Sequence, residues 1–139
     1  MKKYTTILVV IAVTLASVSC NNAQKTTTAA ASKTIEVLAP KAMYDVLAKD
    51  SNAQLVDVRT KDEYGVSHLK DAQNICVTDN DFKEKVANLD KDKPVYVYCK
   101  KGGRSARAAK ILKELGFTQI FDLQGGITNW EKQQLETEQ

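Results

Sequence analysis

Residues 95–115, VYVYCKKGGRSARAAKILKEL, decide the fold of this 139-residue chain. The run opens with the β-forming residues Val95 to Tyr98, which predict a strand buried on both faces. A short loop with two glycines follows, and from Ser105 to Leu115 apolar side chains recur at helical spacing. Gly116 then stands where a helix commonly ends. A buried strand, a tight loop and a helix are the unit from which parallel α/β sheets are built.

The same alternation of strands and helices extends outward in both directions, without internal repeats. Further strands are expected at Ile35 to Leu38, Gln54 to Val58, Ala72 to Val77 and Thr118 to Leu123. Further helices are expected at Pro40 to Lys49, Asp79 to Leu89 and Ile127 to Gln134, with at most one helical turn at Lys61 to Tyr64. We therefore predict one α/β domain over residues 35–139, with a mostly parallel central sheet flanked by helices on both faces.

The composition is that of an ordinary globular protein, with 43% hydrophobic and 27% charged residues. The net charge of +3 is too small to indicate a nucleic-acid partner. One histidine and three scattered cysteines lack the spacing of metal ligands, so we expect no metal site. An odd number of cysteines cannot all pair in disulfides, so at least one has another role.

The N-terminus has the layout of a secretory signal. Two lysines precede the apolar stretch Ile7 to Val13, and small residues follow it up to Cys20. The end of this run, LASVSC, resembles a bacterial lipobox, which predicts a signal peptide over residues 1–19 and lipidation of Cys20. Ser17 stands where that pattern prefers Leu, so cleavage after Ser19 without lipidation is the alternative. Loss of residues 1–19 leaves 18 basic against 17 acidic residues.

A polar segment follows the lipidation site. Asn21 to Thr34 contains no Val, Ile, Leu or aromatic residue, which predicts a flexible tether over residues 20–34. A tether of this kind would hold the folded domain off a bilayer. We therefore expect an exported, periplasmic protein that is anchored to a bacterial membrane by lipid at Cys20.

The loop after the predicted strand Val95 to Tyr98 carries the chemistry. Cys99 follows a buried strand, where open α/β sheets place their active sites. Gly102 and Gly103 let the chain curl so that successive N–H groups form an anion nest. The positive end of the following helix and the charges of nearby Lys and Arg residues also favour a thiolate. The alternative is a buried core cysteine beside a plain turn.

At this point the sequence resembles the rhodanese-like family, over about Ile35 to Trp130. The motifs that carry the resemblance are Asp57-Val58-Arg59, Glu63-Tyr64, His68-Leu69, Asn74-Ile75, Cys99-Lys-Lys-Gly-Gly-Arg104-Ser105, and Leu123-Gln-Gly-Gly-Ile127 with Trp130. The resemblance implies that Cys99 accepts sulfane sulfur from a donor such as thiosulfate. The resulting persulfide would pass its sulfur to cyanide or a thiol, with no other cofactor. We expect a monomer.

The resemblance also implies roles for individual residues. Cys99 would be the nucleophile, and the backbone amides of residues 100–104, including Gly102 and Gly103, would hold the outer sulfur. Arg104, with Lys100 or Lys101, would attract the anionic donor. The supporting residues would be Asp57, Arg59 and Ser105, with a purely structural Asp57–Arg59 ion pair as the alternative. Arg59 and Glu63 could also pair across one helical turn. His68 is expected to be structural and Trp130 to lie in the core.

Three alternatives stay open. Related phosphatases and arsenate reductases use a C-x₅-R loop preceded by His, whereas Cys99 and Arg104 enclose four residues and Tyr98 precedes the cysteine. Sulfur transfer is therefore favoured over phosphatase activity, but a persulfide carrier or an anchoring module remains the main rival. Cys76 is either a buried small hydrophobe or a thiol that resolves oxidised Cys99 as a disulfide. Ser67 and Asp71 stand where the family has Gly.

Overall fold

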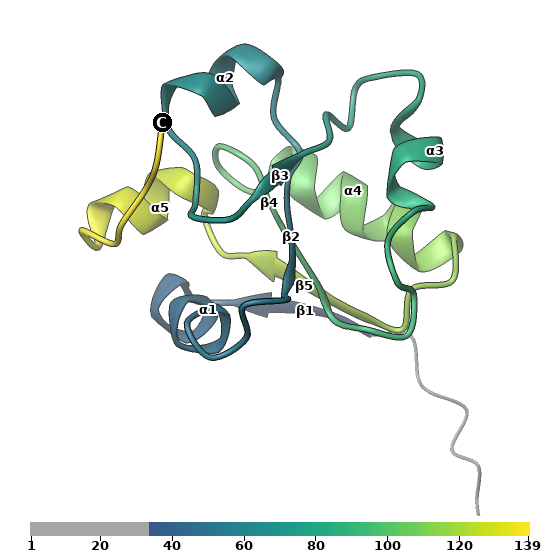
Figure 1. The fold of residues 1–139 in the computed structure, drawn as a ribbon, viewed down its shortest axis with the longest axis horizontal. Helices are drawn as coiled ribbons and strands as arrows, with labels where there is room; N and C mark the ends of the chain where they lie inside the picture. Colours follow the sequence, from purple (N-terminus) through teal and green to yellow (C-terminus); the bar gives the residue numbers. More distant parts are fainter. Residues whose placement is uncertain (1–33) are drawn as a thin grey trace, which may run out of the picture.

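The computed structural model describes residues 34–139, and the predicted signal peptide, Cys20 and most of the predicted tether lie outside them. The fold is an α/β domain around a five-stranded sheet with strand order β1-β5-β4-β2-β3 (Figure 1). Each neighbouring pair of strands runs parallel. The predicted fold class is confirmed, and the sheet is parallel throughout.

The elements follow the predicted order. The strands are β1 (Thr34–Leu38), β2 (Gln54–Asp57), β3 (Gln73–Asn74), β4 (Val95–Tyr98) and β5 (Gln119–Leu123). The helices are α1 (Pro40–Leu47), α2 (Lys61–Val66), α3 (Phe82–Val86), α4 (Gly103–Glu114) and α5 (Gly126–Lys132). Among these residues, no helix is long and apolar enough to cross a membrane.

Several element boundaries differ from the sequence-based expectation. Helix α2 continues two residues beyond the single turn expected, and Thr60 and Glu63 form a capping box at its start. Helix α3 is shorter because residues 77–81 are used by turns. Helix α4 begins at Gly103, two residues early, because Gly102 adopts φ +105° and turns the chain into the helix. Strand β3 has two residues rather than six.

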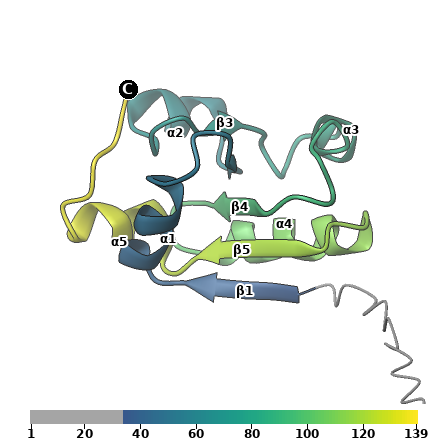
Figure 2. The same ribbon diagram turned by 60° about the horizontal axis from the view of Figure 1, so that its bottom comes forward.

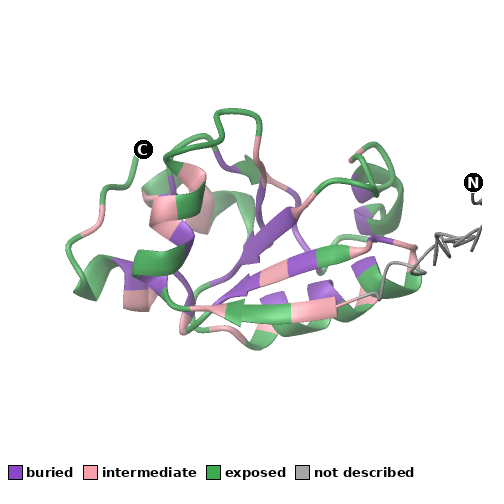
Figure 3. Cartoon of the chain, turned by 90° about the horizontal axis from the view of Figure 1, so that it is seen from below, coloured by how far each residue is buried: buried purple, intermediate pink, exposed green. Residues whose placement is uncertain are grey.

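The sheet is covered on both faces, as expected. Val95 and Val97 of β4 pack in a cluster with α3 and α4, whereas Tyr96 and Tyr98 pack in a second cluster with α1 and α5. Figure 2 shows these layers around the sheet, and Figure 3 shows that β4 is buried along its length. Trp130 lies in the second cluster, which confirms its core position. Because parallel strands point the same way, β2 and β4 bring Asp57 and Cys99 to one edge of the sheet.

Candidate active site

The loop between β4 and α4 surrounds the sulfur of Cys99 with hydrogen-bond donors. The Cys99 side chain is buried, with 2% of its surface exposed. The Gly102 N–H donates to Cys99 Sγ at 3.1 Å, and the Ser105 hydroxyl lies 3.5 Å from the same atom. Ser105 is fully buried in the first turn of α4. The loop therefore brings the Gly102 N–H and the Ser105 hydroxyl to the sulfur.

These donors make Cys99 more acidic than an ordinary thiol. Burial raises the pKa of Cys99, but the Ser105 hydroxyl and the N–H groups of Ser105, Gly102 and Lys101 together lower it further than burial raises it. The side chains of Lys100 and Lys101 are exposed to solvent. The thiolate is thus favoured by local dipoles, while the lysine charges lie at the outer rim of the loop.

The start of helix α5, at Gly125 and Gly126, supports the cysteine loop. The Ile127 N–H donates to the Cys99 carbonyl at 2.9 Å, and the Thr128 N–H donates to the Lys100 carbonyl at 3.1 Å. Gly126 has φ +61°, and a Cβ there would lie 2.6 Å from the Lys100 carbonyl carbon. Only glycine fits this contact. The sequence analysis assigned no such role to Gly125 and Gly126, and the paired glycines of the Leu123-Gln-Gly-Gly-Ile127 motif are the signal that could have identified this support.

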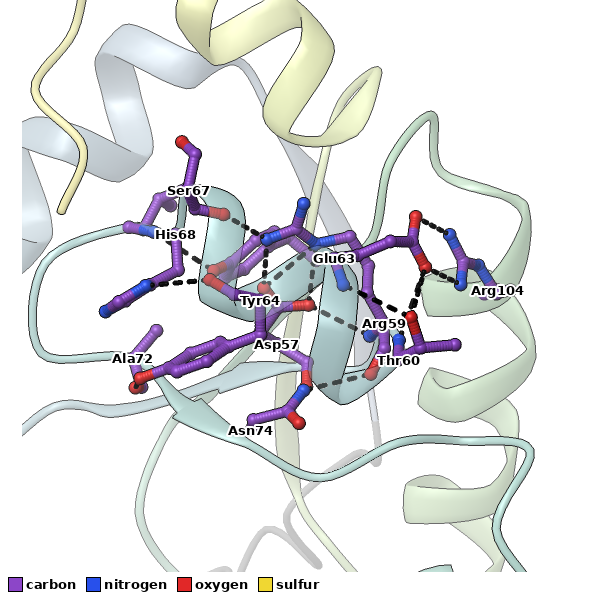
Figure 4. A network of polar contacts seen from close by, with 12 residues as sticks. Asp57, Arg59, Thr60, Glu63, Tyr64, Ser67, His68, Ala72, Asn74 and Arg104 are labelled. Atoms are coloured by element: carbon purple, nitrogen blue, oxygen red, sulfur yellow. Dashed lines mark hydrogen bonds and ion pairs between the residues drawn. The ribbon is translucent and has the colours of Figure 1, made fainter. Parts of the chain in front are cut away.

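Arg104 is held by a carboxylate rather than left free for a donor (Figure 4). Its two terminal nitrogens lie 2.6 and 2.7 Å from the two oxygens of Glu63, which belongs to α2. Hydrogen bonding to Glu63 is the main cause that raises the pKa of Arg104, and Cys99 contributes electrostatically. The suggested pairing of Glu63 with Arg59 is wrong, because Arg104 occupies the Glu63 carboxylate.

Arg59 instead forms a buried ion pair with Asp57. Its Nε lies 3.0 and 2.9 Å from the two Asp57 oxygens, and its Nη2 donates to the Ser67 carbonyl at 2.6 Å. The guanidinium also lies 5.6 Å from the centre of the ring of Tyr98, the residue that directly precedes Cys99 in the sequence. The pair thus ties the end of β2 to the segment after α2 and packs against the strand that carries the nucleophile.

The segment at residues 67–72 is ordered without the family's glycines. Asp71 takes φ +60°, the conformation that glycine adopts most readily. His68 Nδ1 lies 3.0 Å from the Tyr64 carbonyl, and the two rings stack with centroids 3.9 Å apart. These contacts agree with a structural role for His68.

Cys76 is not bonded to Cys99, since both are free thiols. It is buried, and its Sγ lies 3.0 Å from the Thr78 hydroxyl. Its role as a core residue or a resolving thiol stays a prediction. Within residues 34–139, no group of three or more His, Cys, Asp or Glu side chains is arranged to hold a metal ion.

The chain is similar to known proteins in both sequence and structure. Residues 39–133 match the family model described as "Rhodanese-like domain". The solved structure of a rhodanese-related protein from Thermoplasma volcanium superposes with a TM-score of 0.65 at 27% identity, covering 74% of this chain and 97% of that one.

Curated proteins are also similar to this chain in sequence. Thiosulfate sulfurtransferase GlpE of Coxiella burnetii is 35% identical over 86 residues, covering 61% of this chain and 78% of GlpE. The uncharacterized protein YqhL of Bacillus subtilis is 41% identical over 78 residues, covering 56% of this chain and 60% of YqhL. Adenylyltransferase and sulfurtransferase uba4 of Ogataea parapolymorpha is 34% identical over 102 residues, or 65% of this chain, but the match spans only 26% of uba4.

Proposed function

This chain belongs to the rhodanese-like domain family, and from that premise we propose that it is a sulfurtransferase acting through a persulfide on Cys99. The observation that carries the proposal is the buried Cys99 sulfur with the Gly102 N–H 3.1 Å away and the Ser105 hydroxyl beside it. Such a setting favours a thiolate, which is the nucleophilic form of cysteine. The relative GlpE carries the name thiosulfate sulfurtransferase, which supports the same chemistry.

In the first step, the Cys99 thiolate attacks the outer sulfur of thiosulfate. A sulfur–sulfur bond forms to Cys99, the bond within thiosulfate breaks, and sulfite leaves with that bond's electron pair. The exposed Lys100 and Lys101 side chains attract the dianion to the loop. Arg104 contributes less to this attraction because its charge is already paired with Glu63. The anionic outer sulfur of the persulfide is then held by the N–H groups that lined the thiolate.

In the second step, an acceptor removes the outer sulfur. Cyanide or a thiolate attacks that sulfur, the sulfur–sulfur bond breaks, and the electron pair returns to Cys99. The product is thiocyanate or a new persulfide, and the Cys99 thiolate is regenerated. The Gly102 and Ser105 donors stabilise this leaving thiolate as they stabilise the resting one.

A mass measurement on the purified full chain tests the proposal. After incubation with thiosulfate, we expect a gain of one sulfur atom in the wild type and in Cys76→Ser, and no gain in Cys99→Ser. Subsequent addition of cyanide should remove the sulfur and release thiocyanate over many turnovers. If Cys99 gains no sulfur from thiosulfate or from any other sulfane donor, sulfur transfer is wrong for this protein.

The same experiment separates the main rival, a persulfide carrier. A carrier would gain one sulfur on Cys99 but release it once, or only to a partner protein. The pairing of Arg104 with Glu63 supports the carrier alternative, because it reduces the positive charge that is available to bind a small anionic donor. Phosphatase activity ranks lower because the loop is one residue shorter than C-x₅-R.

We further propose that the protein acts outside the cytoplasm on a lipid anchor at Cys20. The support is the basic and apolar N-terminal run that ends in LASVSC. When the full chain is expressed in a bacterium, fatty-acid label should appear in the membrane fraction and disappear in Cys20→Ser. An unlabelled protein that retains Met1 and stays in the cytoplasm would rule out both export and anchoring.

A further inference from the structure

Asp122 is a buried carboxyl group that the proposed reaction does not use. Only 6% of its surface is exposed, and it belongs to β5, which lies between β1 and β4 in the sheet. Across residues 34–139, its Oδ1 is the single buried side-chain nitrogen or oxygen without a hydrogen-bond partner. Leaving such an atom unpaired is costly, so its presence calls for an explanation.

The strand geometry directs Asp122 toward α4 and Ser105. Asp122 pairs with Val97 of β4, two residues before Cys99. Ile120, two residues earlier on β5, packs in one cluster with Ala108 and Ala109 of α4. Alternate residues of a strand share a face, so Asp122 faces α4 as well. Burial raises the pKa of Asp122, and hydrogen bonding to the Ser105 hydroxyl lowers it by less, which agrees with this placement.

The Ser105 hydroxyl therefore lies near the Cys99 sulfur and on the side of α4 that faces Asp122. It is 3.5 Å from Cys99 Sγ and 3.0 Å from the Gly102 carbonyl oxygen, and Ser105 shares the buried face of α4, which Asp122 faces, with Ala108, Ala109 and Leu112. A hydroxyl has one proton to donate at a time. An ionised Asp122 competes for that proton with the Cys99 thiolate and with the Gly102 carbonyl oxygen.

We propose that Asp122 is a positioning residue for Cys99, whose carboxylate draws the Ser105 hydroxyl away from the sulfur and so holds back formation of the thiolate. When Asp122 is neutral or absent, the hydroxyl is free to turn to Cys99 Sγ. The inference rests on the proposed function in taking Cys99 as the nucleophile. It concerns the ionisation of Cys99, which can be measured without any sulfur transfer.

Other charged groups near Cys99 are accounted for separately. Arg104 of α4 interacts with Cys99 and is paired with Glu63 of α2. Lys100 and Lys101 on the loop are exposed, as is Glu36 on the neighbouring β1. None of these side chains changes in an Asp122 variant, so a shift in Cys99 ionisation can be assigned to position 122.

The test measures the alkylation rate of Cys99 by iodoacetamide from pH 4 to 10, in the full chain with Cys76→Ser. Mass spectrometry of the Cys99 peptide reports the rate for this cysteine alone. In Asp122→Asn and Asp122→Leu, we expect the profile to move to lower pH, with alkylation about tenfold faster on its rising limb. In Ser105→Ala, adding either Asp122 substitution should leave the profile unchanged.

Two results would overturn the inference. An unchanged profile in a variant that keeps the native circular dichroism spectrum would make Asp122 purely structural. An equal shift with and without Ser105 would mean that the carboxylate acts on Cys99 directly. Asp122→Leu provides a second variant should the amide fail to fold. A wild-type chain that takes up no sulfur would disprove the proposed function but would leave this test intact.

Discussion

The Arg104 guanidinium and the Glu63 carboxylate form a two-point ion pair, with nitrogen–oxygen distances of 2.6 and 2.7 Å. The pair joins the first turn of α4, which follows the cysteine loop, to the first turn of α2. The two residues are 41 positions apart in the sequence, and each is about 30% exposed (32% for Arg104, 28% for Glu63). The ion pair therefore fixes the end of the active-site loop to helix α2.

Replacement of Glu63 by Gln should remove stability in a pH-dependent way. Hydrogen bonding to Arg104 is the main cause that lowers the pKa of Glu63 from 4.5 to about 2. A lowered carboxyl pKa stabilises the fold above the unfolded value and loses this contribution as the pH falls from 4.5 to about 2. We expect Glu63→Gln to lower the free energy of unfolding by about 1 kcal/mol at pH 7, since solvent screens the pair.

Urea unfolding of the wild type and Glu63→Gln at several pH values checks this prediction. The difference between them should be constant from pH 7 to pH 5 and shrink below pH 4.5. Gln keeps the capping interaction with Thr60, so the helix start is preserved. Asp45→Asn, which breaks an exposed pair with Lys41, is the matched control and should change stability little. A difference that persists undiminished at pH 2 would contradict the conclusion that the ion pair with Arg104 lowers the pKa of Glu63.

The sequence predicted the fold well because its signals are local. The β-rich run Val95 to Tyr98 and the helical spacing after Ser105 each require only short-range patterns. The partners of Arg104 and Arg59 were predicted less well, since pairing depends on side chains that tertiary packing brings together. Asp122 gave no signal at all, because an acidic residue inside a short strand has no pattern that indicates burial.

Replacement of Ser105 by Ala should raise the pKa of Cys99. The Ser105 side chain is the largest single influence that lowers this pKa, and burial, which raises it, remains in the variant. Loss of a hydrogen bond to an anion corresponds to about a tenfold change. We therefore expect sulfur uptake from thiosulfate at neutral pH to fall about tenfold and its rising limb to move to higher pH.

Initial rates of sulfur uptake between pH 5 and 10 measure this change. Ser67→Ala is the matched control, because that hydroxyl bonds to Glu131 on the surface instead of to the sulfur. The control should keep the wild-type profile. A Ser105→Ala enzyme whose rate falls equally at every pH would point to a structural defect and contradict the role in ionisation.

Replacement of Arg59 by Met should destabilise the domain strongly. The change would leave the Asp57 carboxylate, which is fully buried, without its ionic partner. Removing one member of a buried pair costs about 3–5 kcal/mol. Urea unfolding at pH 7 should show this loss, and the double variant Asp57→Leu/Arg59→Met should recover part of it. Cys99 alkylation in the folded fraction decides whether the pair is only structural, in which case the rate stays at the wild-type value.

Lys93→Met is the control for that change, since Lys93 pairs with Asp90 at an exposed position. We expect it to alter the free energy of unfolding by less than about 1 kcal/mol. If Arg59→Met were no more destabilising than Lys93→Met, the Asp57–Arg59 pair would contribute little to the fold.

Replacement of Gly126 by Ala should disrupt the loop that holds Cys99. A methyl group at this position would lie 2.6 and 2.7 Å from the Lys100 carbonyl carbon and oxygen, and the backbone has φ +61°. Both the contact and the conformation are unfavourable, and backbone atoms cannot rotate away as a side chain could. We expect a loss of about 2–4 kcal/mol in the free energy of unfolding, since overpacking and strain add. Sulfur uptake should fall even in the folded protein, because the Ile127 and Thr128 N–H groups would lose their loop carbonyl partners.

Gly65→Ala provides the matched comparison for this last change. Gly65 lies in α2, and a Cβ there would meet no atom within 4 Å. Alanine is favoured over glycine in a helix, so this variant should be as stable as the wild type or slightly more stable. Thermal unfolding and thiosulfate uptake measured side by side distinguish the two sites. Should Gly126→Ala keep both wild-type stability and uptake, α5 would not be the support that fixes the cysteine loop.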